Sequence, residues 1–192
     1  MHELLIKHIS NYIRLDKEEA NYFTSLLRNR KVKKGDFLLR RGETARYDSF
    51  VNKGFLKATF VDKNGKEHLV QFAEENSWIT DYDSFTNSTP SNLEIIAIED
   101  SELLQIEHDQ LAQLFDRIPK FERFYRLVNE QNFISLFRCL ISLLSNSAEE
   151  RYQVFKQKYP RLINRIPQHQ IASFIGISPE YLSRIRSRKA SL

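Results

Sequence analysis

The feature that most restricts the fold of this 192-residue chain is one glycine, Gly176, which stands between two short amphipathic segments. Ile171 and Ile175 share one face of the first segment, and Leu182 and Ile185 share one face of the second, so two helices that cover each other are predicted. Gly176 follows the first helix where it must stop, because glycine reaches the left-handed backbone conformation without steric cost. The segment is therefore predicted to be a helix-turn-helix.

The second helix of this segment is predicted to begin at Pro179 and to bind DNA. Ser178 can accept a hydrogen bond from the free amides of the first turn, and Pro179 removes an amide that would be unpaired. From Arg161 onward, Glu180 is the only acidic residue among several basic ones. This local excess of positive charge is what phosphate binding needs. The residues predicted to contact DNA are Gln168, His169, Ser178, Glu180, Tyr181, Arg184, Arg186, Arg188 and Lys189. The alternative is a short helical hairpin whose cations only solvate it.

Composition excludes several classes of protein. Apolar residues make up 41% of the chain, enough for a core, and the formal charge of +4 does not indicate a whole-surface polyanion binder. The single cysteine, Cys139, excludes an intramolecular disulfide and a four-cysteine metal or cluster site. No stretch approaches the roughly 18 unbroken apolar residues of a membrane span. We therefore expect a cytoplasmic protein with no membrane partner.

The region before residue 107 has the pattern of an antiparallel sheet. Short runs of Phe, Leu, Val and Thr are separated by turn dipeptides at intervals of roughly ten residues, which is typical of a closed or sandwiched sheet. Asn64-Gly65 predicts a two-residue hairpin. We predict an α+β fold with an N-terminal jelly-roll barrel, resembling a cyclic-nucleotide-binding domain, at about residues 31–106.

Two capping boxes predict where shorter helices begin. Asp16 with Glu19 lies before the barrel, and Ser147 with Glu150 opens the helix that follows the long one.

A long helix is predicted from Lys120 to about Ser145. Its apolar residues form two adjacent stripes with heptad-like spacing. One stripe can pack on the barrel, and the other is most simply buried against a second copy, which predicts a homodimer; an intrachain helical bundle is the alternative. The predicted domains are a sensor domain at 1–119, a dimerisation helix at 120–145 and a DNA-binding helix-turn-helix domain at 146–192.

The order of these parts resembles the cyclic-AMP receptor protein and oxygen-regulator (Crp/Fnr) family of bacterial transcription factors. The resemblance covers nearly the whole chain and rests on KKGDFLLRRGE and VNKGFLKATF, on NSWITDYDSFTNSTPSNLEIIAIEDSELLQI, and on QIASFIGISPEYLSRI. It implies a dimer whose barrels sense a signal and whose recognition helices enter successive major grooves of a palindromic site. By that similarity Glu180 and Arg184 read bases, with Ser178 and Tyr181 nearby, and RNA polymerase is a further candidate partner.

Two features depart from this family. Its cyclic-AMP-binding members resemble one another in a Gly-Glu-Leu turn and a later Arg-Ser or Arg-Thr, which hold the ribose and phosphate. The predicted ligand pocket here has instead Thr80, Asp81, Tyr82, Ser91 and Asn92. Without the phosphate-binding arginine we do not expect cyclic AMP, and an unknown effector or no ligand at all stay equally open.

The second departure is at the C-terminus. Seven residues follow Ile185, so no C-terminal wing is expected, and Arg186, Arg188 and Lys189 would bind phosphates instead.

Two other functions compete with DNA-binding regulation. Some jelly rolls are metal-dependent enzymes, but His68 is the only histidine between Gly35 and Glu107, so a two-histidine iron site cannot be built there. We therefore expect neither an enzyme nor a metal site. The second competitor is a small-molecule sensor or interaction module that has no sequence-specific DNA binding.

Overall fold

The computed structural model describes residues 2–190, with side chains for residues 2–187. The chain divides into two compact units, of which the first extends to Asn129 and the second begins at Glu130. This boundary lies inside the long helix α5 (Lys120–Ser145), which contributes to both units. The predicted division at 119 and 145 stays a prediction, and each unit is described below by itself.

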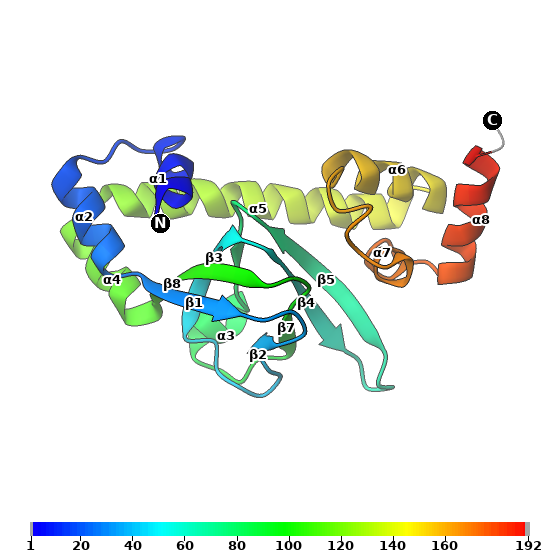
Figure 1. The fold of residues 1–192 in the computed structure, drawn as a ribbon, viewed down its shortest axis with the longest axis horizontal. Helices are drawn as coiled ribbons and strands as arrows, with labels where there is room; N and C mark the ends of the chain where they lie inside the picture. Colours follow the sequence, from blue (N-terminus) through cyan, green and yellow to red (C-terminus); the bar gives the residue numbers. More distant parts are fainter. Residues whose placement is uncertain (1, 191–192) are drawn as a thin grey trace. The chain divides into compact units, whose positions relative to one another are not determined.

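The first unit is a sheet-based body with helices at both ends of its sequence (Figure 1). Its elements before α5 are α1 (Glu3–Ser10), α2 (Lys17–Ser25), β1 (Arg28–Val32), β2 (Phe37–Leu39), β3 (Tyr47–Lys53), β4 (Phe55–Val61), β5 (Glu67–Glu74), β6 (Trp78–Ile79), α3 (Tyr82–Asn87), β7 (Leu93–Ala97), β8 (Ser101–Glu107) and α4 (His108–Arg117). The capping box predicted for Asp16 and Glu19 is present at the start of α2, where the Asp16 carboxylate accepts from the Glu19 amide at 2.9 Å.

The strands form two four-stranded antiparallel sheets, in the orders β1-β8-β3-β6 and β2-β7-β4-β5. Chain neighbours therefore often lie in different sheets, as in a jelly roll. In the first sheet Arg28 pairs with Gln105, and in the second Leu56 pairs with Ala97. The predicted jelly-roll barrel and α+β fold are confirmed.

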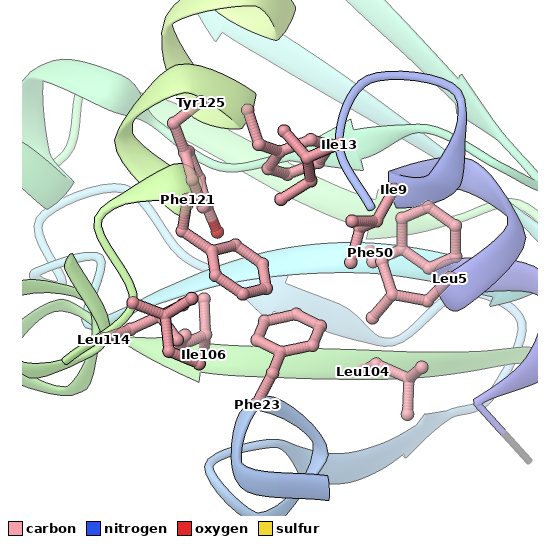
Figure 2. Packing of buried hydrophobic residues seen from close by; sticks show 12 residues of the cluster. Leu5, Ile9, Ile13, Phe23, Phe50, Leu104, Ile106, Leu114, Phe121 and Tyr125 are labelled. Carbon is pink, nitrogen blue, oxygen red and sulfur yellow. The ribbon is translucent and has the colours of Figure 1, made fainter. Parts of the chain in front are cut away.

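Alternation along the central strands divides the core of this unit into two clusters. In β3 and β8, Val51 and Leu103 join the buried residues inside the barrel, whereas Phe50 and Leu104 point to the helices. Figure 2 shows this second cluster, in which Phe23 of α2 lies against Phe121 of α5 with ring centroids 4.7 Å apart. The barrel thus keeps its own interior while its outer face holds the first turns of α5.

The hairpin between β4 and β5 forms where it was predicted, but its turn is of another kind. The loop runs from Asp62 to Lys66, whose backbone groups are hydrogen-bonded at 3.0 Å, so three residues rather than two lie at the tip. The Asp62 carboxylate accepts from the amides of Asn64 and Lys66, and only Gly65 has a positive φ in this loop. Because an aspartate stabilises this longer turn, the two-residue turn predicted for Asn64-Gly65 is wrong.

The second unit is helical and comprises α5 from Glu130, α6 (Ala148–Lys158), α7 (Gln168–Phe174) and α8 (Pro179–Ala190). The predicted capping box of Ser147 and Glu150 opens α6, with the Ser147 amide donating to the Glu150 carboxylate at 2.8 Å. The core of this unit consists of Tyr152, Phe155, Leu162, Ile166, Ile171, Ala172, Ile175, Leu182 and Ile185.

The second half of α5 carries large apolar side chains that the described chain leaves exposed. The exposed fraction reaches 67% for Leu136 and 80% for Leu144. The exposed apolar residues on this helix are Phe133, Ile134, Leu136, Phe137, Leu140, Ile141, Leu143 and Leu144. Even so, none of the helices within the described residues combines the length and the hydropathy needed to cross a bilayer.

Candidate functional site

The turn between α7 and α8 closes with a pair of backbone hydrogen bonds that fix its direction. The Gly176 amide donates to the Ser173 carbonyl at 3.2 Å, and the Ile177 amide donates to the Ala172 carbonyl at 2.9 Å. These are the two bonds of a Schellman motif, in which the residue after the C-cap takes a left-handed conformation. Gly176 has φ +71°, as the sequence predicts for this position. The helix-turn-helix backbone is therefore formed by local chemistry.

The start of α8 is held by Ser178, whose hydroxyl accepts from the Tyr181 amide at 3.2 Å. The neighbouring Glu180 is exposed. Hydrogen bonding to its own amide lowers the pKa of the Glu180 carboxyl below its usual value, and the Ser178 hydroxyl and the Arg184 charge act in the same direction. Glu180 is therefore an anionic acceptor at the exposed end of the helix, which suits an exocyclic amine of cytosine.

A second set of contacts holds Tyr181 and Arg184. The Tyr181 hydroxyl donates to Glu149 of α6 at 3.1 Å, which ties the first turn of α8 to the preceding helix. The Arg184 guanidinium lies 5.1 Å from the centroid of the Tyr181 ring, and the residue is exposed. A planar guanidinium resting on an aromatic ring keeps its outer donors available for a bidentate acceptor such as guanine.

The remaining predicted DNA contacts lie at both ends of the motif. Gln168 and His169 begin α7; Gln168 is partly buried and His169 is exposed. Arg186 is exposed on the same helix as Arg184. The side chains of Arg188 and Lys189 lie outside the described residues. Seven of the nine predicted contacts are thus placed by the structure, and all seven lie within α7, α8 or the turn between them.

The barrel of the first unit contains a separate cavity of about 180 Å³. Its wall includes three buried polar residues, Ser49, Thr80 and Gln105, and the Gln105 amide donates to the Ser49 hydroxyl at 2.9 Å. The volume is below the roughly 300 Å³ from which small-molecule pockets commonly start. The cavity can therefore hold only a small polar ligand without rearrangement of its walls.

Of the five residues predicted for a ligand pocket, Thr80 alone lines this cavity. Asp81 and Ser91 are brought together, but their side chains bond to each other at 2.6 Å, and the Asp81 carboxylate also caps α3 by accepting from the amides of residues 83 and 84. Tyr82 donates to Asn129 of α5 at 2.8 Å, and Asn92 is exposed. The Asp81–Ser91 pair thus serves the loop itself, and the role of the five residues in ligand binding stays a prediction.

Sequence reasoning missed two charged residues beside the cavity, Glu43 and Arg46. Both are exposed and come from the segment RRGETAR, before β3. The density of charge around a glycine turn was the available signal for this segment. Arg46 places a cation at the cavity. It lies outside Thr80–Tyr82 and Ser91–Asn92, the two stretches that match the family's cyclic-AMP-binding motifs and contain no arginine.

An acidic side chain, Asp48, is buried on the outer face of β3 with 1% of its surface exposed. Burial raises the pKa of its carboxyl to about 7, against which the hydrogen bond from the Ser49 amide acts weakly. Two neighbouring tyrosines are affected by the Asp48 charge. Burial, and in second place the Asp48 carboxylate, raise the pKa of Tyr82 to about 12. The same two causes raise the pKa of Tyr125 well above its usual value. The Tyr125 hydroxyl has no hydrogen-bond partner among the described residues.

Comparison with known proteins agrees with this architecture. The family described as cyclic nucleotide-binding domain matches residues 29–118. Transcriptional activator protein Anr of Pseudomonas aeruginosa is 25% identical over 174 residues, covering 84% of this chain and 70% of that protein. Two solved structures share the fold with a TM-score of 0.75 at 15% identity. The c-di-GMP responsive global regulator CLP of Xanthomonas campestris covers 92% of both chains, and FixK2 of Bradyrhizobium japonicum covers 86% of this chain and 85% of its own.

Proposed function

We propose that the chain is a member of the Crp/Fnr family of transcription regulators, and that it is a cytoplasmic, homodimeric regulator that reads a palindromic operator with α8. This function includes no catalytic step. The observation that carries it is the Schellman turn at Gly176 followed by the capped start of α8, because together they fix a helix whose outer face bears Glu180 and Arg184. A helix presented in this way fits the major groove.

The base-reading role is supported by the separation of Glu180 and Arg184. Residues four apart lie on the same face of a helix, so both side chains reach the same groove. The competing explanation is an intrahelical ion pair without a role in recognition. Arg184 instead stacks on Tyr181, and no ion pair within 4.0 Å joins it to Glu180 among the described residues.

Fluorescence anisotropy with operator and random duplexes tests this role. We expect Arg184→Ala to lose about 1–3 kcal/mol of discrimination between operator and random DNA. The matched control is Arg123→Ala, which removes an exposed arginine from α5 in the first unit. Unchanged discrimination in Arg184→Ala would show that this arginine does not read bases. A chain that binds no duplex, at any salt concentration, would instead be the sensor or interaction module without DNA binding.

Arg186, Arg188 and Lys189 are proposed to bind phosphates of the DNA backbone. Each phosphate contact adds about one unit to the slope of log affinity against log salt. Neutralising all three should therefore reduce that slope by about three units. An unchanged slope would contradict this part of the proposal.

Dimerisation is proposed to bury one exposed apolar stripe of α5. Phe133, Leu136, Leu140 and Leu144 follow one another at spacings of three and four, so a second α5 can cover them by knobs-into-holes packing. Light scattering should show a dimer for the wild-type chain and a monomer for Leu136→Lys at micromolar concentration. Val70→Lys is the control, because Val70 is also a half-exposed apolar residue but lies on β5. A monomeric wild-type chain would overturn the proposed dimer.

The input signal is proposed to be an unidentified small molecule held by the barrel. CLP is described as responsive to c-di-GMP, which is a property of that protein. In this chain the small volume of the barrel cavity argues against the binding of cyclic AMP in the conformation described. RNA polymerase is a separate candidate partner, of the DNA-bound dimer. Calorimetric titration with cyclic AMP and cyclic GMP tests this expectation. Micromolar binding of either nucleotide would show that the cavity opens to admit it.

A further inference from the structure

The second unit contains a larger cavity than the barrel, between α5 on one side and α6 and α7 on the other. Its volume is about 370 Å³, within the range of small-molecule pockets. Most of the wall is apolar and includes Ile134, Leu143, Val154 and Phe155. All of its lining residues lie between 131 and 175, so the cavity belongs to the second unit alone.

The charged residues of this wall are all basic. Arg138, Arg151 and Lys158 line the cavity, and none of the lining residues is acidic. The Lys158 ammonium donates to the Ser135 hydroxyl at 2.8 Å, and among the described residues no carboxylate forms an ion pair with it. Burial lowers the pKa of Lys158, and the nearby Cys139 opposes this. An apolar chamber bordered by cations complements a molecule with an apolar body and one negative end.

We propose that this cavity binds a small amphipathic carboxylate, with its carboxylate at Lys158 and Arg138 and its apolar body against Ile134, Leu143 and Val154. The site is distinct from the barrel cavity. It also borders the recognition motif, since the Arg151 guanidinium donates to the carbonyl of Ile175 at 2.8 Å, one residue before Gly176. A bound carboxylate would therefore touch the walls that support the turn of the helix-turn-helix.

A second copy of the chain does not account for this cavity through the proposed dimer interface. With 100° between successive residues of a helix, Leu136, Leu140 and Leu144 lie on the side of α5 opposite to Ser135 and Ser142, which line the cavity. Pairing of two α5 helices along the leucine stripe thus leaves the cavity side uncovered. Ile134 and Leu143, which line the cavity, lie at the two borders between the leucine stripe and the cavity wall.

Decanoate is the probe for this site, and the full-length chain without DNA is titrated by calorimetry. Decanoate is expected to bind at least about tenfold more tightly than 1-decanol, because a charge-assisted contact contributes about 1.5 kcal/mol or more, and decylammonium should bind more weakly than either. Lys158→Met should abolish the preference for decanoate over decanol. The matched control is Lys156→Met, on the same helix, since Lys156 lies over Tyr152 and outside the cavity.

Cys139 gives an independent readout of the position of the ligand. It lines the cavity and is the only cysteine of the chain, so alkylation by iodoacetamide produces one mass shift. Saturating decanoate should slow this alkylation several-fold in the wild-type chain and in Lys156→Met. Absence of saturable binding, equal affinities for decanoate and decanol, or binding that leaves Cys139 alkylation unchanged would each overturn the proposal. DNA binding is assayed separately, so these outcomes do not depend on it.

Discussion

Replacing the buried Asp48 by asparagine should stabilise the first unit at alkaline pH and leave it nearly unchanged at acid pH. The folded state holds the Asp48 proton up to a pKa of about 7, whereas the reference value is 3.8. Between these values the folded state binds a proton that the unfolded state releases, so the wild-type free energy of unfolding falls as pH rises. The difference of about three units corresponds to about 4 kcal/mol at 1.36 kcal/mol per unit.

Asparagine has nearly the shape of protonated aspartate but does not ionise. The stability advantage of Asp48→Asn should therefore be small near pH 4, grow by at most about 1.4 kcal/mol per pH unit, and level off above pH 7. Tyr82 and Tyr125 face the carboxyl and stay neutral in this range, because burial raises the pKa of both. The expected signature is a pH-dependent difference, since a constant offset could arise from the amide itself.

The measurement is urea-induced unfolding followed by the fluorescence of Trp78. This residue is the only tryptophan, and its ring lies 6.0 Å from that of Tyr125, so its emission reports on the unit that contains Asp48. Asp116→Asn is the control, because Asp116 is exposed on α4 and its replacement should change stability by less than about 0.5 kcal/mol. A wild-type to Asp48→Asn difference that is equal at pH 5 and pH 8 would refute the reasoning.

Two glycines should respond differently to alanine. At Gly176 an added Cβ would meet only a methyl of Leu143 at 3.5 Å. Gly176→Ala should therefore lower the free energy of unfolding by about 1–2 kcal/mol, from its positive φ alone, and Gly176→Asn should lower it less. Denaturation followed by circular dichroism measures both losses. At Gly54 a Cβ would overlap Ser101 and lie 2.7 Å from the carbonyl oxygen of Asp100. Gly54→Ala should therefore cost about 3 kcal/mol or more by Trp78 fluorescence, and equal losses at both sites would contradict the steric account.

The elements that the sequence predicted best are those whose ends are determined locally. The helix at 120–145 and the capping boxes at Asp16 and Ser147 agree with the structure, because each depends on side chains within one or two turns. The turn at Gly176 belongs to the same class. The hairpin tip shows the limit of this reasoning, since Asn64-Gly65 favours one turn while the carboxylate of Asp62 stabilises another.

The two cavities could not be predicted in the same way, because their walls come from segments far apart in the chain. Glu43 and Arg46 meet Thr80 and Gln105 only through the pairing of the sheets. In the second unit, Lys158 reaches Ser135 because α6 folds back along α5. The pattern of Asp81 and Ser91 did place two polar groups together, yet only the structure shows that they bond to each other.

The edge of the first sheet restricts how two barrels can meet. β1 is an edge strand, and Arg28, Arg30 and Lys31 place positive charge along it. Two copies that tried to join these edges into a continuous sheet would bring like charges together, which is a common protection against aggregation through strand addition. Uncontrolled association of barrels through the β1 edge is therefore disfavoured. A chain with neutral residues at these three positions is the variant to test for fibre formation.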